Sequence, residues 1–326
     1  MTGLWRPGGR WWPAPAGILA GCLADLMLAD PRRGHPVAGF GRCATALESL
    51  TYRDSRVAGA VHTGALVGGL LGIGAALHRR LEGGYVFAFT AAATWVALGG
   101  TTLARTGSEM ADLLAVDDVE GARAVLPSLC GRDPAVLDPA GLVRAACESV
   151  AENTSDAQVA PLLWAALGGA PGVLAYRGIN TLDAMIGNRS DRYARFGWAA
   201  ARLDDLANYL PARLAGVIAI AAAPLVGGAP LQASKAWVRD ARRHPSPNAG
   251  IPEAVFAGAL GVRLGGPTQY RYQLEIRPTL GDGPDPSVAD LRRAVRLSRI
   301  VQCVAMVVAV TISAAVRSGR PVSPPR

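Results

Sequence analysis

The sequence is poor in charged residues and contains almost no lysine. Only 18% of its 326 residues are Asp, Glu, Lys or Arg, whereas 50% are hydrophobic. Soluble domains usually carry about 25% charged residues. Lys235 is the only lysine, so the net charge of +8 comes almost entirely from arginine. This composition argues against an ordinary soluble domain and indicates an integral membrane protein.

Motifs for several common functions are also missing. The five cysteines form no Cys-x-x-Cys pair, which argues against a disulfide framework and against a zinc site. No Walker loop, dinucleotide fingerprint or Ser/His/Asp order is present, so any nucleotide binds in an unfamiliar way. The arginines are scattered through loops between apolar runs. That distribution fits positive-inside anchoring in a membrane better than nucleic-acid binding.

Apolar runs are distributed along the whole chain and predict membrane helices. They cover residues 14–28, 57–77, 85–104, 157–176, 214–226 and 300–316. The second and third runs reach the roughly 20 residues that a helix needs to cross the hydrocarbon. The first run predicts a short or tilted membrane helix. A signal peptide is the alternative, because Leu19-Ala20-Gly21-Cys22 resembles a lipoprotein cleavage site.

The fourth apolar run, residues 157–176, makes a poor straight helix. Pro161 and the segment Gly168-Gly169-Ala170-Pro171-Gly172 interrupt it. We expect a broken or re-entrant pair of short helices that returns the chain to the same membrane face. The sequence as a whole thus predicts one all-α, polytopic membrane domain over residues 1–326. It has about five spanning helices, helical cytoplasmic loops and flexible tails at 1–13 and 318–326.

A first island of polar residues precedes the broken run. Glu148, Glu152 and Asp156 lie at positions i, i+4 and i+8, so on an α-helix they share one stripe. Three like charges repel each other unless a cation binds, and Mg²⁺ held by carboxylate and phosphate oxygens is such a partner. A solvated acidic face is the alternative. The short polar side chains of Asn153 and Thr154 make a purely solvating helix less attractive.

A second polar island follows the broken run. Asn180 and Asp183 share one face of a helix that we expect to end at Gly187. The island then combines arginines suited to phosphate or carboxylate with acids suited to a metal. These residues are Arg189, Asp191, Arg192, Tyr193, Arg202, Asp204 and Asp205. Anchoring of the chain at the membrane surface by arginine and tyrosine is the alternative.

Two proline-framed loops hold further candidates. His35 stands between Asp30-Pro31 and Pro36, where it could act as a general base or a substrate ligand. A hydrogen bond within the loop is the alternative role. In the second loop, Asn248 lies in a turn and Glu253 follows it, so both could reach a shared site.

Together these polar segments resemble the CobD/CbiB family of cobalamin biosynthesis, the adenosylcobinamide-phosphate synthases. The resemblance extends from about Gly17 to about Val316. Its motifs are Asp25 with Asp30-Pro31, His35-Pro36-Val37, Glu148 to Asp156, Asn180-Thr181-Leu182-Asp183, Arg192-Tyr193, Phe196-Gly197-Trp198, Ala201 to Asp205, Asn208-Tyr209, Pro211-Ala212-Arg213, Ser246 to Gly250, Pro252-Glu253-Ala254, Gly258 to Gly261 and Leu264-Gly265-Gly266. Each motif is weak, but their joint order and spacing are specific. The chain departs from the family pattern at Ala29, usually glycine, at Ala157-Gln158 and at Ile251.

The resemblance implies a ligase that forms an amide bond. A phosphorylated amino alcohol such as aminopropanol phosphate would be joined to the propionate carboxyl of adenosylcobyric acid, with ATP and Mg²⁺ as cofactors. The resemblance indicates which residues matter, and we assign their roles from their chemistry. We expect catalytic roles for His35, Glu148, Glu152, Asn153, Asp156, Asn180 and Asp183. We expect substrate or phosphate binding by Asp30, Arg189, Arg192, Tyr193, Arg202, Asn248 and Glu253. We expect Glu152, Asp156, Asp183, Asp204 and Asp205 to be metal ligands.

The same resemblance implies a bacterial inner membrane location, with the active site at the cytoplasmic face. The expected partners are the two substrates, membrane lipid and other enzymes of cobalamin assembly, but no nucleic acid. Two alternatives stay open. One is a membrane protein that binds or transports a corrinoid without ligase activity. The other is a membrane amidase or phosphotransferase with a different substrate. The amine donor itself is left open among aminopropanol, ethanolamine and threonine phosphates.

Overall fold

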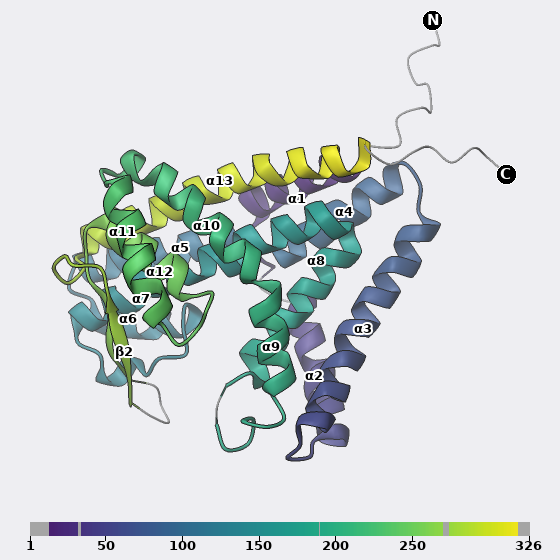
Figure 1. Cartoon of the computed structure of the whole chain (residues 1–326), viewed down its shortest axis with the longest axis horizontal. Helices are drawn as coiled ribbons and strands as arrows, with labels where there is room; N and C mark the ends of the chain where they lie inside the picture. Colours follow the sequence, from purple (N-terminus) through teal and green to yellow (C-terminus); the bar gives the residue numbers. More distant parts are fainter. Residues whose placement is uncertain (1–12, 32–33, 189, 270–273, 319–326) are drawn as a thin grey trace, which may run out of the picture. The chain divides into compact units, whose positions relative to one another are not determined.

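The chain is almost entirely helical, as the sequence predicts (Figure 1). A computed structural model describes residues 13–31, 34–188, 190–269 and 274–318. Within this described part, five helical stretches are long and apolar enough to cross a membrane. They are Arg56–Arg80, Gly84–Ala115, Pro139–Ile186, Tyr209–Val226 and Val288–Val316. The all-α polytopic class is therefore confirmed.

The chain is organised into two compact units, and each draws on separate stretches of sequence. The first comprises Met1–Leu98, Pro161–Asp204 and Met306–Arg326, and the second comprises Gly99–Ala160 and Asp205–Ala305. The interpretation of residues 1–326 as a single domain stays a prediction. The tails predicted at 1–13 and 318–326 lie outside the described residues, except for Pro13 and Ser318, which are the first and last residues of helices.

In the first unit, α1 (Pro13–Leu28) packs closely along α4 (Gly84–Ala97) (Figure 1). Two glycines of α1 make this approach possible. A methyl group at Gly17 would lie 2.8 Å from the carbonyl oxygen of Phe87, and one at Gly21 would lie 2.7 Å from that of Ala91. At 16 residues α1 is shorter than a spanning helix, in agreement with the short first helix that the sequence predicts.

The backbone conformation of Ala29, the residue after α1, shows why glycine is usual at this position in the family pattern. Ala29 has φ of 55°, in the left-handed region, which costs a residue with a Cβ about 1–2 kcal/mol. Glycine adopts this conformation without strain. The carbonyl oxygen of Ala29 accepts a hydrogen bond of 3.0 Å from the indole nitrogen of Trp95. The usual glycine thus has a conformational reason, and alanine is strained at the same turn.

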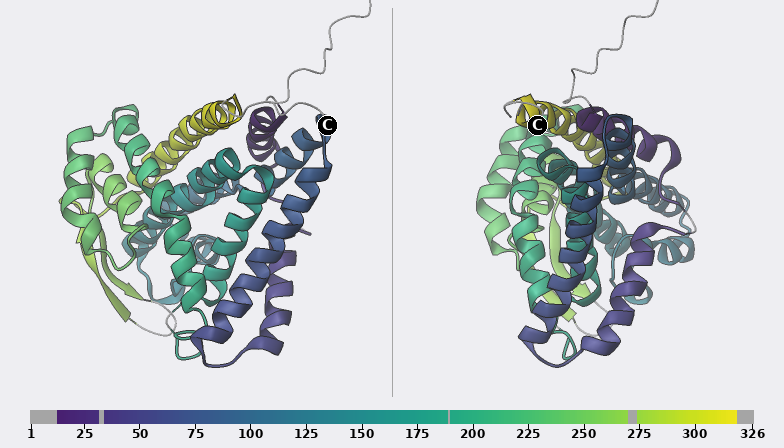
Figure 2. Two further views of the ribbon diagram at one scale, coloured as in Figure 1. Left: turned by 45° about the vertical axis from the view of Figure 1, so that its right-hand side comes forward. Right: turned by 90° about the vertical axis from the view of Figure 1, so that its right-hand side faces the viewer.

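The second half of α8 (Ala160–Ile186) contributes Leu182 and Ile186 to a hydrophobic core of the first unit that also contains Ala44 and Phe196. Here α2 (Pro36–Thr51) packs beside α3 (Arg56–Arg80) (Figure 2). The predicted break is confirmed, because Gly169 has a non-helical φ of 62° and ψ of −156° inside α8, two residues before Pro171. The helix ends at Ile186, immediately before Gly187, as predicted. The return of the chain to the same membrane face stays a prediction.

The second unit begins with α5 (Gly100–Ala115), α6 (Val119–Val125), the short 3-10 helices η1 (Leu126–Ser128) and η2 (Pro134–Val136), and α7 (Pro139–Thr154). A π-helical turn, η3 (Ser155–Val159), follows α7 directly. Glu148 and Glu152 lie on α7, as the predicted α-helical stripe requires, whereas Asp156 lies in the π-turn, outside the α-helix. That Asp156 shares the stripe stays a prediction. Within this segment, Thr154 and Gln158 both hydrogen-bond the hydroxyl of Ser298.

The remaining helices run through both units or lie in the second one. The helix α9 (Trp198–Ala207) crosses the boundary between the units and is followed by α10 (Tyr209–Ala222) and η4 (Ala223–Val226). Residues 232–299, between the last two predicted membrane helices, form regular elements. These elements are most of α11 (Pro230–Asp240), η5 (Ala241–Arg243), α12 (Gly250–Leu260), β1 (Leu264–Gln269), β2 (Leu274–Leu280) and the start of α13 (Val288–Ser318).

The antiparallel hairpin β1–β2 packs against α11 and α12 (Figure 2). Its pairing places Leu264 opposite Leu280 and Gly266 opposite Arg277, with an irregularity between the two pairs. Gly265 and Gly266 have φ of 82° and 84°, a conformation that favours glycine. The Leu264-Gly265-Gly266 motif therefore starts a bulged strand, which an apolar-periodicity analysis does not detect.

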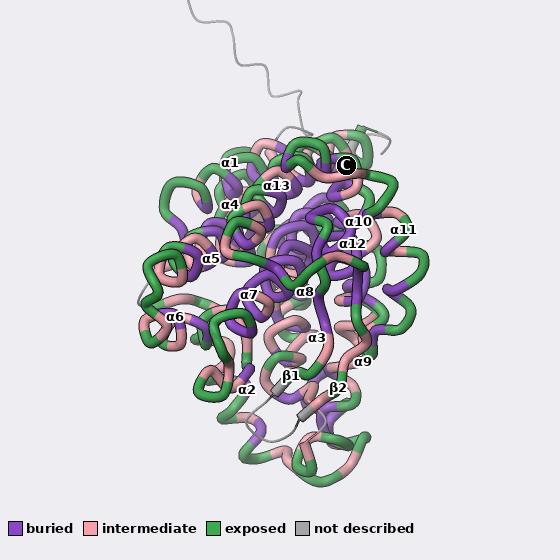
Figure 3. The backbone as a smooth tube through the Cα atoms, turned by 90° about the vertical axis from the view of Figure 1, so that its left-hand side faces the viewer, coloured by how far each residue is buried: buried purple, intermediate pink, exposed green. Residues whose placement is uncertain are grey.

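Burial in the second unit is greatest along α12 and α7 (Figure 3). Every residue of α12 is buried, and α7 is buried over most of its second half. Glu148, Ser149 and Thr154 on α7 and Glu253 on α12 are therefore removed from water. Burying such groups without a partner costs several kcal/mol, so each one needs either a partner or a function.

Candidate functional site

Six ionisable side chains from separate segments come together inside the second unit. They come from α7, from the loops before η2 and after η5, from α12 and from β2. We call this set the buried charged cluster. Its members are Arg132, Glu148, Glu152, His244, Glu253 and Arg277.

One part of the cluster is fully paired. The guanidinium of Arg132 donates a hydrogen bond to Oε2 of Glu148, and both side chains are buried. The other carboxylate oxygen, Oε1, accepts a hydrogen bond of 2.7 Å from the backbone N–H of Gly265 at the start of β1. Burial lowers the pKa of Arg132, but the charge and hydrogen bond of Glu148, together with the charges of Cys130 and Glu253, outweigh it and raise that pKa above its usual value. This pair holds α7, the loop before η2 and the hairpin together.

The other part of the cluster lacks such partners. Oε1 of Glu253 lies 3.6 Å from Nε2 of His244 and 3.9 Å from Nη1 of Arg277. Across the described residues, neither carboxylate oxygen of Glu253 nor Nε2 of His244 has a hydrogen-bond partner, and all three atoms are buried. The other ring nitrogen of His244, Nδ1, accepts a hydrogen bond of 3.1 Å from the N–H of Ser246. The proton of the neutral ring therefore resides on Nε2, which faces Glu253.

The surroundings of this pair shift both of its pKa values. Burial, together with the charges of Glu148 and Glu152, raises the pKa of Glu253 well above its usual range, although Arg277 and Arg132 oppose the shift. Burial and the charge of Arg277 lower the pKa of His244. Displaced values of this kind are typical of groups that exchange protons in active sites.

In the first unit, a second polar arrangement fastens the loop after α8 to α2. The carboxylate of Glu48 accepts a hydrogen bond of 2.7 Å from Arg192 and one of 3.0 Å from the hydroxyl of Tyr193. The guanidinium of Arg192 also stacks 4.1 Å above the ring of Tyr52, whose hydroxyl donates to the carbonyl of Arg192. Arg192 and Tyr193, predicted to bind phosphate, thus already have partners within the unit, although Arg192 stays largely exposed.

His35 lies where its alternative role, a hydrogen bond within the loop, would place it. Its Nδ1 accepts a hydrogen bond of 3.1 Å from the N–H of Val37 and so caps the start of α2. Its Nε2 lies 3.4 Å from Oδ1 of Asp30. Both ring nitrogens are therefore engaged in holding the loop before α2, and a role in proton transfer stays a prediction.

Several predicted site residues make hydrogen bonds within their own unit. Asn153 donates 2.9 Å to the carbonyl of Ser149, one turn earlier in α7. Asn180 accepts from Arg177 at 3.3 Å in α8. The amide of Asn248 donates 2.7 Å to the carbonyl of Asp205 and accepts from Arg213. Arg189 lies outside the described residues.

The predicted metal ligands are divided between the units. Asp183 and Asp204 belong to the first, whereas Glu152, Asp156 and Asp205 belong to the second. Among the residues that the structure describes, no group of three or more His, Cys, Asp or Glu side chains is placed to hold a metal ion. The metal set stays a prediction, as does the phosphate-binding role of Arg202 in the first unit.

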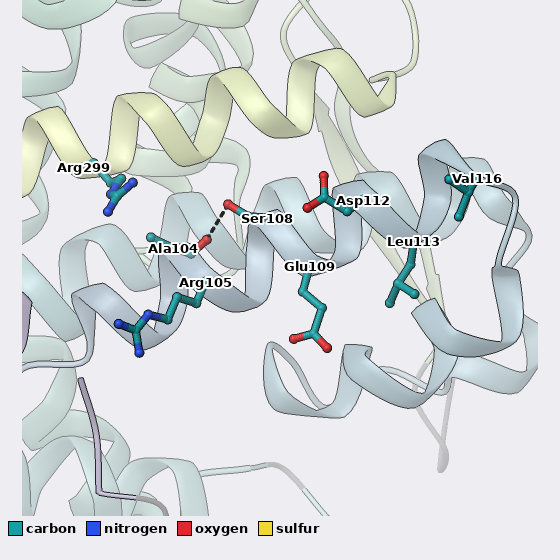
Figure 4. Close-up of a pocket in the computed structure, with 8 residues that line it drawn as sticks. All are labelled: Ala104, Arg105, Ser108, Glu109, Asp112, Leu113, Val116 and Arg299. Carbon is teal, nitrogen blue, oxygen red and sulfur yellow. Dashed lines mark hydrogen bonds between the residues drawn. The ribbon is translucent and has the colours of Figure 1, made fainter. Parts of the chain in front are cut away.

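A cavity of about 490 Å³ lies along α5 in the second unit (Figure 4). Its lining consists of Ala104, Arg105, Ser108, Glu109, Asp112, Leu113, Val116 and Arg299. Charges of both signs are present, and Asp112 already pairs with Arg292 at 2.8 Å. None of the lining residues belongs to the buried charged cluster or to the residues singled out from the sequence, so we assign the cavity no role.

Four residues of these arrangements were missed in the sequence: Glu48, Arg132, His244 and Arg277. His244 carried a usable signal, because it precedes Pro245 as His35 precedes Pro36. The other three lie in segments without a motif. Their importance follows from partners that are distant in the sequence, which residue patterns do not reveal.

Fold and site together define a class of protein: a polytopic, all-α membrane protein that buries a cluster of carboxylates, guanidinium groups and a histidine. A family model described as "CobD/Cbib protein" matches residues 18–298. The chain therefore belongs to the CobD/CbiB family.

Relatives of this chain carry the name "Cobalamin biosynthesis protein CobD". One from Mycobacterium tuberculosis (strain ATCC 25618 / H37Rv) is 65% identical over 302 residues, covering 93% of this chain and 96% of the relative. One from Geobacter metallireducens is 42% identical, covering 92% and 97%. One from Rhodobacter capsulatus is also 42% identical, covering 84% and 90%. No solved structure matches the chain. The family assigns the chain a role in cobalamin biosynthesis.

Proposed function

We propose that this chain is an adenosylcobinamide-phosphate synthase. It joins a phosphorylated amino alcohol, such as aminopropanol phosphate, to the propionate carboxyl of adenosylcobyric acid through an amide bond. The observation that carries the proposal is the buried charged cluster in a member of this family. It combines a carboxylate that has no hydrogen bond within the described residues and a histidine, both with displaced pKa values, with two arginines. A protein that only carried a corrinoid would not need such a costly arrangement.

The proposed chemistry needs an activated carboxyl group. A carboxylate does not react with an amine directly, because oxide is a poor leaving group. ATP transfers a phosphoryl group to the carboxylate, which gives an acyl phosphate and ADP. The amine then attacks the acyl carbon, the bond to the phosphate oxygen breaks, and the amide and inorganic phosphate are formed. The protein's part is to position the reactants, to balance charge and to move protons.

ATP and Mg²⁺ are the proposed cofactors. Mg²⁺ is usually held by one or two carboxylates together with phosphate oxygens of the nucleotide. A preassembled group of three acidic ligands is therefore not required, and the residues fit a metal that arrives with ATP. Glu152, Asp156 and Asp205 in the second unit, and Asp183 and Asp204 in the first, are the proposed carboxylates. When bound, the metal would screen the charge of the phosphates during phosphoryl transfer.

A product assay by mass spectrometry tests the proposal. Purified protein in detergent receives adenosylcobyric acid, Mg·ATP and a mixture of aminopropanol, ethanolamine and threonine phosphates. We expect a corrinoid product whose mass corresponds to one amide, formed only with ATP, and its mass identifies the donor. Absence of product with every donor, while the corrinoid still binds, would favour a binding or transport protein.

We also propose that the protein lies in the bacterial plasma membrane with both polar islands at the cytoplasmic face, where ATP is available. Ser155 is buried and unsuitable for labelling, whereas Asp191 and Glu120 are exposed. We expect single cysteines at these two positions, in a variant without the native cysteines, to react with a membrane-impermeant thiol reagent in inverted vesicles. Both should be protected in intact cells. Labelling of the two from opposite sides would contradict the re-entrant arrangement.

A further inference from the structure

The buried charged cluster has more negative than positive groups. Glu148, Glu152 and Glu253 contribute three carboxylates, whereas Arg132 and Arg277 contribute two guanidinium groups. The lowered pKa of His244 favours its neutral form. Glu275 adds a partly exposed carboxylate that lies 3.4 Å from Arg277. When all three of these carboxylates are ionised they exceed the guanidinium groups by one charge. Burial raises the pKa of Glu253 and opposes this state, so a cation bound beside Glu253 would favour its ionised form.

The missing positive charge is assigned to Glu253 because its two carboxylate oxygens have no hydrogen bonds within the described part of the chain. Glu148 is satisfied by Arg132 and by the N–H of Gly265, whereas both oxygens of Glu253 lack hydrogen bonds across the described residues. Arg277 approaches one of these oxygens no closer than 3.9 Å. The carboxylate of Glu253 thus has acceptor capacity for the hydrogens of a bound donor, and His244 lies within 3.6 Å of it.

A protonated amine fits this environment better than a metal ion. An ammonium group donates up to three hydrogen bonds and carries one positive charge, which equals the excess negative charge of the cluster. Mg²⁺ demands several oxygen ligands in near-octahedral geometry. Two guanidinium groups beside Glu253 disfavour a divalent cation at this carboxylate.

We propose that Glu253 binds the ammonium group of the amine donor and accepts the proton that it must lose, with the Nε2–H of His244 beside it to favour the ionised carboxylate. This inference rests on the proposed ligase function. An ammonium nitrogen has no lone pair and cannot attack. Its first proton passes to the carboxylate of Glu253, and the freed lone pair forms the bond to the acyl carbon while phosphate leaves. The nitrogen of the resulting intermediate releases its second proton to the departing phosphate as the amide forms.

The charged groups around Glu253 come from every element that contributes to this cluster. Glu148 and Glu152 lie on α7, Arg277 and Glu275 on β2, Arg132 before η2, and His244 before α12. From α11, Asp240 is occupied by Arg239 and by the N–H of Gly281. Glu253 is therefore the member of this set that combines complete burial with two unpartnered oxygens among the described residues.

A comparison of two nucleophiles, the phosphorylated amine and hydroxylamine, distinguishes proton acceptance by Glu253 from a structural role. Glu253→Gln keeps the shape of the side chain but cannot accept a proton. With the phosphorylated amine as nucleophile, we expect the rate of amide formation to fall by about 10²–10⁴-fold, the usual contribution of a general base. Hydroxylamine is largely unprotonated at neutral pH and needs no such base. Hydroxamate formation from the corrinoid carboxyl and ATP should therefore stay within a few-fold of the unsubstituted protein.

The pH profile gives a second readout. In the unsubstituted protein, amide formation should decline as the pH falls through the pKa of Glu253, because the protonated carboxyl cannot accept a proton. Glu253→Gln should lose this step and show a residual rate that rises steadily with pH as free amine accumulates. His244→Gln should retain the low-pH step but lower the rate. Glu120→Gln, the same change at an exposed position of the second unit, is the control and should leave both reactions unchanged.

The possible failures are distinguishable. If Glu253→Gln lowers amide and hydroxamate formation equally, Glu253 has a structural role and the inference is overturned. The same holds if the variant weakens the dependence on Mg²⁺ rather than on the amine donor, because the site then serves a metal. If the unsubstituted protein forms neither amide nor hydroxamate, the proposed ligase function itself fails, and the inference fails with it.

Discussion

Replacing Arg132 with methionine is expected to lower the free energy of unfolding by about 3–5 kcal/mol. The change removes the partner of Glu148 and leaves a buried carboxylate uncompensated, which is among the most destabilising effects of a single substitution. Both side chains are buried, with exposed fractions of 7% for Arg132 and 2% for Glu148. Denaturant unfolding in detergent, followed by tryptophan fluorescence, measures the change.

Two comparisons show whether this loss arises from burial of the pair. Arg263→Met removes an exposed ion pair with Asp285, in which both side chains are about half exposed, and should change stability by no more than about 1 kcal/mol. Adding Glu148→Gln to Arg132→Met removes the buried charge and keeps an oxygen for the N–H of Gly265. The double variant should recover at least half of the loss. Equal effects of Arg132→Met and Arg263→Met would contradict our account of the cluster.

The features that the sequence predicts well are those with a local cause. Apolar runs of sufficient length identify the spanning helices whatever their neighbours are. The break in α8 follows from the Gly-Gly-Ala-Pro-Gly segment, and its end at Ile186 follows from Gly187. Each of these signals acts within a few residues. These signals can therefore be recognised in the sequence without knowledge of the tertiary structure.

The composition of the buried charged cluster depends on contacts that are distant in the sequence. Arg132 and Glu148 are separated by 16 residues, and Glu148 and Gly265 by 117. No periodicity relates such positions, so sequence patterns point to the acids but not to the arginines that face them. The π-turn after α7 is likewise not visible in the sequence pattern, which treats Asp156 as part of a regular α-helix.

Residue type alone also does not separate catalytic from structural roles. His35, Arg192 and Asn248 belong to motifs of the family resemblance, yet each is engaged in holding a loop. A side chain that caps a helix and one that binds substrate can be the same polar residue at the same spacing. What distinguishes Glu253 is the lack of partners for its buried oxygens in the described part of the chain, and this property is visible only in three dimensions.

Two glycine-to-alanine substitutions in α3 are expected to change stability in opposite directions. A methyl group at Gly59 would overlap the carbonyl oxygen of Phe196 and lie 2.6 Å from its carbonyl carbon. The obstacle is backbone, which cannot rotate away as a flexible side chain can. The first unit must therefore shift α3 or the segment around Phe196, and such overpacking costs about 1–3 kcal/mol or more. We expect Gly59→Ala to lower the midpoint of unfolding in detergent accordingly.

Gly68→Ala is the matched control, because it makes the same change nine residues later in the same helix. A methyl group there meets no atom within 4 Å in the described part of the chain. Alanine is the better helix former by about 0.8–1.0 kcal/mol, so this variant should be slightly more stable than the unsubstituted protein. If Gly59→Ala stabilises the protein as Gly68→Ala does, then α3 does not approach Phe196 as closely as the structure places it. The packing of α3 against the loop that Glu48 and Arg192 hold would then need to be redrawn.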